Sequence, residues 1–375
     1  MDIRKHPIND EDLHQLLISR NSMDKIELLH ILNNYINKFK RGKISATIFT
    51  SDEDPSSTLL NLSDSFHEVK IHKFDNFSEI FIHVINKSDD EENEIIEYET
   101  GYSYIIKLCE GIWAILSIEE DDHIEFVHNF IKYGSPDISR LNFTSNDIKK
   151  IIGAILNNEG YDAIIKKAVT YPYGGKGAIN FEPMDFYQVF EKCNDENRFL
   201  DKARISIIKN DEEIIDFFVS RVGIIRFYSG NIDYFFNLFV NAFAESAKHT
   251  KRILENRERK FGETSVKPIV INFNSDVFIK LNNNSQFINS LSTLDKTGIS
   301  VYHSNPYLHV SIVDFQDGSS YDVFAISSKS VCIVPSFRSS INSLMKISDH
   351  IFKSVGEGEI DVWHEKELTL SDYFE

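Results

Sequence analysis

The sequence predicts a mixed α/β or α+β protein built from three units. Apolar residues recur at helical spacing in some segments and alternate with polar residues in others, which is typical of amphipathic helices and half-buried strands. The 375 residues are 42% hydrophobic and 12% aromatic, a composition that favours a packed core over a disordered chain. Because domains usually hold about 100–200 residues, a chain of this length is expected to contain two or three of them.

The N-terminal unit, residues 1–170, is predicted to combine a helix pair with a sheet and two further helices. Residues 11–40 repeat leucine and isoleucine at helical spacing, with a break near Asn21. Strand-like runs then cover residues 43–50, 67–74, 79–86, 103–111 and 112–118. Two helices are expected at 121–134 and 144–158, the second after a Thr-Ser-Asn capping signal.

The middle unit, residues 171–265, is predicted to be a hairpin followed by a long helix. Glycines and prolines gather in residues 171–183, which favours a junction there. Residues 201–230 indicate two or three strands with an acidic turn at 211–213. One helix of about 45 Å is expected over 231–261, apolar in its first half and charged in its second.

The C-terminal unit, residues 266–375, is predicted to be an α/β layer with a mixed sheet. A strand at 266–273 and a helix at 285–298 precede four strand-like runs, and a second helix follows at 340–356. The strand-like runs cover residues 299–303, 307–315, 320–327 and 330–336. An acidic tail is expected after the last helix.

Composition disfavours several classes of protein. A net charge of −18 repels polyanions, so a protein that wraps nucleic acid with its whole surface is not expected, although local contact with nucleic acid stays open. No run approaches the ~18–20 apolar residues of a membrane helix, and the N-terminus lacks the apolar stretch of a signal peptide. These features predict a cytoplasmic protein without membrane contact.

Neither a metal nor a cofactor is predicted. Cys109, Cys193 and Cys332 lie far apart in the sequence, without the spacing of a zinc site or a disulfide framework. The glycine-rich residues 173–178 lack the first glycine and the Ser/Thr of a phosphate-binding loop, with Thr170 in the place of that glycine. The histidines are scattered and form no HExxH motif.

A stretch around His309 is the first candidate for chemistry. His309 heads the alternating run LHVSIVD, a turn FQDGSSY follows, and a strand then leads to the small-polar residues 327–330. This order of strand, histidine, turn, strand and small-polar element resembles the phospholipase-D-like phosphodiesterases. The resemblance covers about one sixth to one quarter of the chain. It implies a nucleophilic histidine at His309, a lysine clamp on the phosphate oxygens and a second copy of the motif.

The stretch departs from that family where the chemistry is most demanding. Ser311 stands in the place of the lysine, and Gln316 stands at the usual aspartate position, with Asp317 one residue later. Lys329 and Ser330 replace the end of the small-polar element, and the chain shows one degenerate copy of the motif. Three interpretations follow: an active phosphodiesterase, a retained but inactive domain of that kind, or an unrelated α/β sheet with a histidine beside a hairpin.

The second candidate is a metal-dependent nuclease site. Glu68-x-Lys70 lies in a strand-like run and follows Asp52 and Asp54. Nucleases of the restriction type hold Mg²⁺ with such acidic residues and place the lysine beside the attacking water. The alternative is a cross-strand charge pair on the solvent face of a strand.

The charged end of the long helix is the main candidate for binding. Its cations could contact the phosphates of a nucleic acid or an acidic partner, including the acidic segments 88–99 and 117–125 of another copy. The alternative is that they complement the helix dipole and keep the helix soluble. The candidate residues are Lys248, Lys251, Arg252, Arg257, Arg259 and Lys260.

Together these patterns predict a non-catalytic binding or assembly subunit. Residue usage rich in Ile, Asn, Lys and Phe, with the resemblance around His309, points to a prokaryotic multi-protein system that acts on nucleic acid, such as phage defence. Its expected partners are other protein subunits or further copies of the chain. The alternative function is a nuclease or phosphodiesterase that uses His309, or Mg²⁺ held through Glu68 and Lys70.

Overall fold

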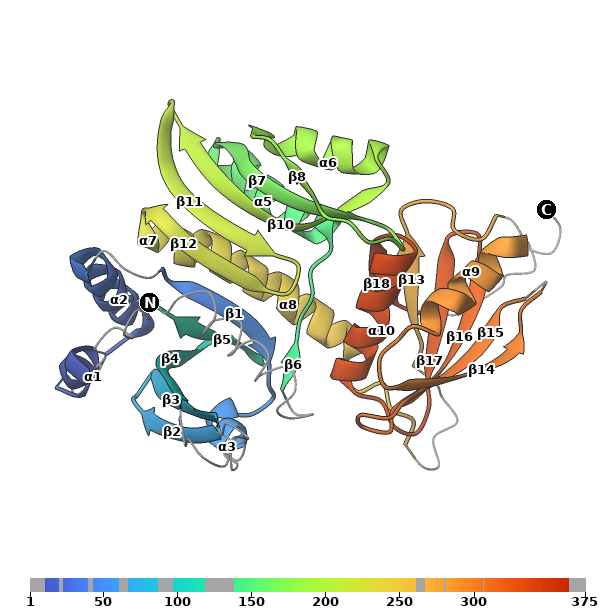
Figure 1. Cartoon of the computed structure of the whole chain (residues 1–375), viewed down its shortest axis with the longest axis horizontal. Coiled ribbons are helices and arrows are strands. Elements are labelled where there is room, and N and C mark those ends of the chain that lie inside the picture. Colours follow the sequence, from blue (N-terminus) through green and yellow to red (C-terminus); the bar gives the residue numbers. More distant parts are fainter. Residues whose placement is uncertain are drawn as a thin grey trace, which may run out of the picture. The chain divides into compact units, whose positions relative to one another are not determined.

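A computed structural model shows helices and antiparallel sheets, which confirms the α+β class that the sequence predicts (Figure 1). The structure describes residues 11–19, 23–39, 43–60, 67–86, 97–118, 138–260, 267–279, 281–305 and 307–363. It divides into two compact units, the first formed by residues 1–172 and 176–249 and the second by 173–175 and 250–375. Among the described residues, no helix is long and apolar enough to cross a membrane.

The first unit is organised around one 12-stranded sheet, called here the large sheet. Its strands run in the order β2-β3-β4-β5-β1-β12-β11-β10-β7-β8, while β6 pairs with β1 and β9 with β7. The strand bounds are β1 Ser45–Thr50, β2 His67–Lys73, β3 Phe77–Asn86, β4 Glu97–Cys109, β5 Ile112–Ser117, β6 Ser139–Arg140, β7 Asp162–Pro172, β8 Ile179–Phe181, β9 Met184–Asp185, β10 Arg198–Lys209, β11 Glu212–Ser220 and β12 Ile224–Gly230.

The large sheet joins two segments that the sequence assigns to separate units. β1 pairs with β5 on one side and with β12 on the other, so the predicted N-terminal segment and the predicted hairpin share one sheet. The structure therefore has two units where the sequence predicts three. Neither unit boundary at 170/171 nor that at 265/266 is present, and the division falls instead inside a helix at His249.

Helices cover the large sheet and show the expected end signals. The described helices of this unit that precede Phe235 are α1 Glu11–Ile18, α2 Lys25–Phe39, α3 Pro55–Leu60, α5 Ser145–Glu159, α6 Phe186–Asp195 and α7 Ile232–Tyr234. α5 begins at a capping box in which the Thr144 side chain accepts from the N–H of Asp147, and it ends at Gly160 in the left-handed conformation, with a φ of 65°. The predicted helix at 121–134 lies outside the described residues.

The predicted long helix is present, but it contains a π-helical segment and ends before the predicted residue. α7 continues into the π-helical segment η1, Phe235–Val240, and then into α8, Asn241–Leu254. Four apolar residues of η1 are buried, and the rings of Phe217 and Phe239 lie 4.5 Å apart. The helix stops at Leu254, seven residues before the predicted end at 261.

The second unit contains a six-stranded sheet, called here the small sheet, in the order β14-β15-β16-β17-β13-β18. Every strand pair in it is antiparallel, so the prediction of a mixed sheet is wrong. Short turns join β14 through β17 as successive hairpins, and such turns force antiparallel neighbours. The elements are β13 Ile269–Phe273, α9 Leu281–Leu291, β14 Thr297–His303, β15 His309–Asp314, β16 Ser320–Ser327, β17 Ser330–Pro335, α10 Ile341–Ser354 and β18 Gly358–Val362.

A charge network holds β7, β10 and β11 together across the large sheet. The Asp216 side chain is 2% exposed, and it accepts hydrogen bonds from Lys166 at 2.8 Å and from Arg204 at 2.6 Å. Burial alone would raise the pKa of Asp216, but the hydrogen bonds and charges of Arg204 and Lys166 outweigh it and hold that pKa below its usual value. The network therefore stabilises the fold only while Asp216 is ionised.

We expect Asp216→Asn to lower the free energy of unfolding at pH 7 by about 1–3 kcal/mol, because two cations lose their charged acceptor. A carboxylate whose folded-state pKa is depressed stabilises the fold above its unfolded-state pKa and loses that contribution as the pH falls through the folded-state value. The difference between wild type and variant should thus be constant above about pH 5 and shrink below about pH 4. Denaturant unfolding of both proteins from pH 2 to 7 measures it; a gap that stays constant down to pH 2 contradicts the assignment.

Candidate functional site

His309 lies at the start of β15, where its ring is stacked between two neighbouring strands. The ring of Phe324 on β16 is 4.2 Å away and nearly parallel, and that of Tyr302 on β14 is 4.8 Å away. Nε2 of His309 faces Oδ1 of Asp322 at 3.4 Å. The ring therefore belongs to a cross-strand aromatic ladder, which is the kind of side-chain packing that stabilises sheets.

The other residues of the His309 stretch serve the local fold. Asp317 accepts a hydrogen bond from the hydroxyl of Ser340 at the start of α10. Burial would raise the pKa of Asp317, but the hydrogen bonds that its carboxylate accepts outweigh this effect and hold the pKa below its usual value. Ser311 pairs with Ser300 on β14, and the strand that begins at His309 contains no lysine. The resemblance to phospholipase-D-like enzymes stays a prediction, and the ladder accounts for the position of His309 without catalysis.

The predicted Glu68-x-Lys70 element lies on β2, but a different lysine faces the acidic loop. Lys70 is exposed and lies over the ring of Phe81 at 6.0 Å, while the side chain of Glu68 lies outside the described part of the structure. Lys73, three residues further on, pairs with Asp54 at 2.7 Å. Odd and even positions of a strand point to opposite faces, so Lys70 and Lys73 lie on different sides of the sheet.

The predicted cationic helix end does not form a continuous exposed strip. Lys251 is 8% exposed and pairs with Glu255 at 2.7 Å, and Lys248 lies 3.7 Å from Glu110. Arg252 is exposed on α8. Most of the charge on this part of the helix thus has a carboxylate close by.

The remaining three cations lie beyond the end of the helix. Arg257 is 8% exposed, and its Nε donates to the carbonyl of Ile253 in the last turn of α8. Burial lowers the pKa of the Arg257 guanidinium below its usual value. Arg259 lies over the ring of Phe337 at 5.4 Å, whereas Lys260 is exposed. The expectation that Arg257, Arg259 and Lys260 lie on the helix is therefore wrong, while binding by the six cations stays a prediction.

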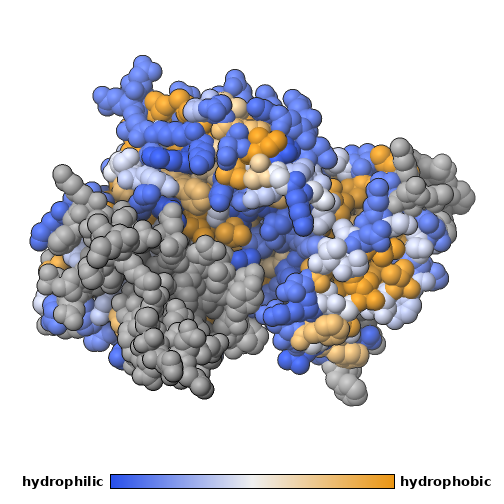
Figure 2. Space-filling model, viewed as in Figure 1, coloured by the Kyte–Doolittle hydropathy of each residue, from blue (hydrophilic) through white to orange (hydrophobic). Residues whose placement is uncertain are grey.

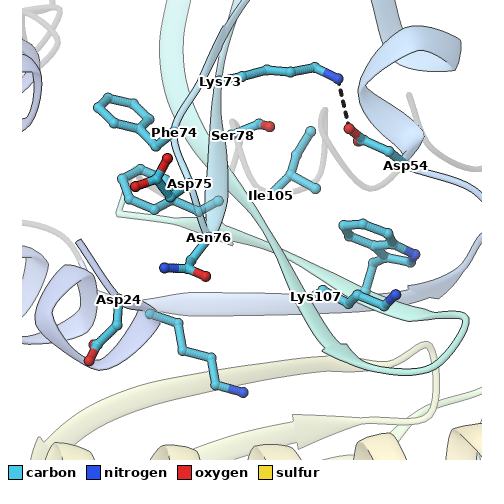
Figure 3. A pocket seen from close by; sticks show the side chains of 12 residues that line it. Asp24, Asp54, Lys73, Phe74, Asp75, Asn76, Ser78, Ile105 and Lys107 are labelled. Atoms are coloured by element: carbon cyan, nitrogen blue, oxygen red, sulfur yellow. Dashed lines mark hydrogen bonds and ion pairs between the residues drawn. The ribbon is translucent and has the colours of Figure 1, made fainter. Parts of the chain in front are cut away.

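A pocket of about 460 Å³ opens at one end of the large sheet (Figure 3). Its floor comes from neighbouring strands, because the register pairs Lys73 with Ser78, Ser78 with Ile105, and Lys107 with Trp113. The start of α2 and the loop before α3 form its walls. The lining residues are Asp24, Lys25, Asp54, residues 73–78, Ile105, Lys107 and Trp113.

Two carboxylates of this pocket already interact with groups of the protein itself. Asp54 pairs with Lys73, drawn as the dashed line in Figure 3, and it also accepts from the N–H of Ser56 at 2.9 Å. Burial would raise the pKa of Asp54, but Lys73 and Ser56 together hold it below the usual value. Asp24 caps α2 by accepting from two backbone N–H groups, each at 2.8 Å.

Two lysines and a tryptophan of the lining remain, Lys25, Lys107 and Trp113. Lys107 lies 5.6 Å from the ring of Trp113, and Lys25 lies 5.6 Å from the ring of Phe236. Neither lysine forms an ion pair with a carboxylate in the described part of the chain. Nε1 of Trp113 donates to the carbonyl of Ser51 at 3.1 Å, which fixes the orientation of the ring.

The sequence predicts one residue of this pocket as part of a site, but it does not predict the pocket. Asp54 is noted as a possible metal ligand, but the lining residues come from five separate segments, and none of those segments carries a motif. Among the described residues, no group of His, Cys, Asp and Glu side chains has the arrangement of a metal site.

Comparison with known protein families and with curated protein sequences finds no match to this chain.

We expect Arg257→Glu to lower the free energy of unfolding by about 2 kcal/mol or more, because it replaces a buried donor with a carboxylate beside carbonyl oxygens. Arg252→Glu is the matched control, since Arg252 is exposed and its reversal should change stability by less than about 0.5 kcal/mol. Urea unfolding of the two variants and wild type provides the comparison. Equal and small effects would contradict the structural role of Arg257.

Proposed function

We propose that this protein is a non-catalytic binding or assembly subunit of a prokaryotic multi-protein system that acts on nucleic acid, such as phage defence. We further propose that the pocket at the end of the large sheet holds a nucleotide. The observation that carries this proposal is the combination of an oriented indole with two ammonium groups in one pocket of about 460 Å³. Small-molecule sites typically have volumes of about 300–1,000 Å³.

The charges of the pocket support an anionic ligand. Asp54 is already neutralised by Lys73, and Asp24 is committed to the N-terminus of α2. Lys25 and Lys107 are then the cations available to a ligand, against the single carboxylate of Asp75. Ammonium groups bind phosphate oxygens through charge-assisted hydrogen bonds, which are stronger than neutral ones.

The aromatic residues of the pocket support a ligand that also has a flat part. Trp113 is half-buried, so one part of its ring packs on the core and another part remains open to the pocket. Phe74 adds a second ring, stacked on Phe77 with centroids 4.4 Å apart. Bases stack on such rings without a sequence preference. A nucleotide joins a flat base to an anionic phosphate and matches both features.

Fluorescence of a single tryptophan tests the proposal. Trp113 and Trp363 are the two tryptophans of the chain, so Trp363→Phe leaves the indole of the pocket as the only emitter. We expect adenosine monophosphate to quench this emission in a saturable manner. Adenosine and inorganic phosphate, which each lack half of the ligand, should bind at least about tenfold more weakly.

Lys107→Ala in this background should weaken binding by about tenfold or more, since a hydrogen bond to a charged group contributes about 1.5–3 kcal/mol. Lys209→Ala is the matched control, because Lys209 lies 4.9 Å from the ring of Tyr161 in a similar cation and ring pair outside the pocket. Equal losses in the two variants would indicate a general charge effect and overturn the assignment. The assignment would also be overturned if none of the three probes quenched the emission in a saturable manner.

The alternative of a nuclease is tested with the same proteins. Purified protein is incubated with single-stranded DNA and RNA, with and without Mg²⁺. Cleavage that is lost in His309→Ala would replace the binding proposal with a phosphodiesterase, and Mg²⁺-dependent cleavage that is lost in Glu68→Ala would replace it with a metal-dependent nuclease. The aromatic ladder around His309 leads us to expect no cleavage that depends on His309.

A further inference from the structure

In the described part of the chain, four strands stand at the ends of the two sheets. One of them, β14, has neither charge nor proline, and its register irregularity is confined to its last residues, between Val301 and His303. Charged side chains, proline and short length protect the edges of natural sheets. β2 carries Glu68, Lys70 and Lys73, β8 is three residues long, and β18 carries Glu359 and Asp361. β14 has the sequence TGISVYH, with neither a formal charge nor a proline over seven residues.

This uncharged strand is also exposed and apolar. Val301 is 48% exposed and Tyr302 is 61% exposed, and all residues from 300 to 303 are accessible. β14 is the outer strand of the small sheet, and Figure 2 shows orange, apolar residues at the surface of this unit in the region where Figure 1 draws β14. An exposed edge of this composition is a template for another strand.

The hydrogen-bond pattern shows which groups of β14 are available. The N–H of Phe315 donates to the carbonyl of Lys296 at 2.9 Å, directly before the first register pair of β14 and β15. In an antiparallel ladder, bonded and non-bonded pairs alternate, so Gly298 and Ser300 direct their backbone groups toward β15. The N–H and C=O groups of Thr297, Ile299 and Val301 therefore point to the open side.

We propose that β14 pairs with β14 of a second copy, antiparallel about a two-fold axis at Ser300, so that two small sheets become one continuous sheet. This register places Ile299 opposite Val301 of the second copy, and both strands then contribute the backbone groups that face outward. β-branched residues in such cross-strand pairs are among the favourable combinations in sheets. An interface about a two-fold axis is closed and does not propagate into fibres.

The outer face of the strand is complementary to itself in the same register. Gly298 stands opposite Tyr302 of the second copy. A Cβ atom at Gly298 would lie 2.7 Å from the ring of Phe315, so that ring already covers the glycine. In the proposed register an aromatic residue, Tyr302 of the second copy, stands across from this glycine, and such pairs stabilise strand edges.

The absence of formal charge on β14 is what allows a second copy of this acidic chain to approach there. The protein carries a net charge of −18, so copies repel one another at most of their surface, and pairing is favoured where no formal charge is present. β14 is such a place, whereas the opposite edge of the same sheet carries two carboxylates. The proposal does not rest on the ligand assigned to the pocket.

Cysteine cross-linking of the full-length chain tests the register. A non-bonded pair across the two-fold axis brings the two Cα atoms of Ser300 to about 4.5 Å, which lies within the range of disulfides. Ser300→Cys is therefore expected to form a reducible covalent dimer under mild oxidation. Ser311→Cys is the matched control, because Ser311 is the partner of Ser300 on the internal strand β15 and should give no dimer beyond the wild-type level.

Light scattering after size-exclusion chromatography tests the interface itself. We expect a dimer for wild type and for Ile326→Lys, and at least about a tenfold weaker association for Val301→Lys, which places two charges in the interface. Ile326 is 42% exposed on β16 and so matches Val301 in accessibility. Far-UV circular dichroism and the thermal midpoint of Val301→Lys establish that the variant is folded.

Three results would overturn the proposal: a monomeric wild-type chain at all concentrations, a dimer that Val301→Lys leaves intact, or equal cross-linking of Ser300→Cys and Ser311→Cys. Nucleotide quenching in the Val301→Lys variant separates this proposal from the proposed function. Normal quenching by a monomeric Val301→Lys protein would show that the pocket and the edge act independently.

Discussion

The structure of the first unit depends on the pairing of β1 with both β5 and β12. All six residues of β1 are buried, including Ser45 and Thr47, so the strand lies in the interior of the sheet on both faces. Its removal would leave β2–β5 and β7–β12 as separate sheets. Ser45 accepts a hydrogen bond from Arg226 on β12 at 2.9 Å, which satisfies a hydroxyl that burial would otherwise make costly.

The pocket is a consequence of that pairing. Its floor belongs to β2–β5, but Lys25 in its wall lies over Phe236 of η1, which follows β12 in the chain. α2 also packs against α7. The wall and the floor therefore face each other because β1 holds the two halves of the sheet in one register. A binding site built in this way uses residues from distant segments on a rigid scaffold, as many ligand sites do.

Local features of the fold could be predicted from the sequence because they depend on neighbouring residues. The strands β1 to β5, the capped helix α5 and the hairpins of the small sheet follow from periodicity and turn chemistry, which act over a few residues. The merging of two predicted units could not be predicted, since the contact between Ser45 and Arg226 joins residues 181 positions apart. β7 was missed because its glycine-rich continuation at 173–178 favours a junction over a strand.

For charged residues, too, the sequence pattern does not reveal whether a side chain serves the fold or a binding site. Cations near the end of a helix have two uses, and the sequence pattern is identical for both. Arg257 illustrates the structural use, since its guanidinium satisfies the carbonyl of Ile253 that the end of α8 leaves without a helical partner. The Glu-x-Lys pattern points to Lys70 and not to Lys73, because it does not reveal which face of β2 looks toward Asp54.

The acidity of the chain makes short-range chemistry decisive for both proposals. At physiological ionic strength, charges beyond about 8 Å are largely screened, so a net charge of −18 slows the approach of an anion more than it weakens its final contacts. Within the pocket, Lys25 and Lys107 act at contact distance, where screening is weak. At β14 the favourable terms are backbone hydrogen bonds and apolar side chains, which do not depend on net charge.

Added salt should therefore relieve the repulsion between copies and strengthen edge pairing, while it weakens the attraction of a phosphate to the pocket. Opposite responses to salt follow from the different forces at the two places.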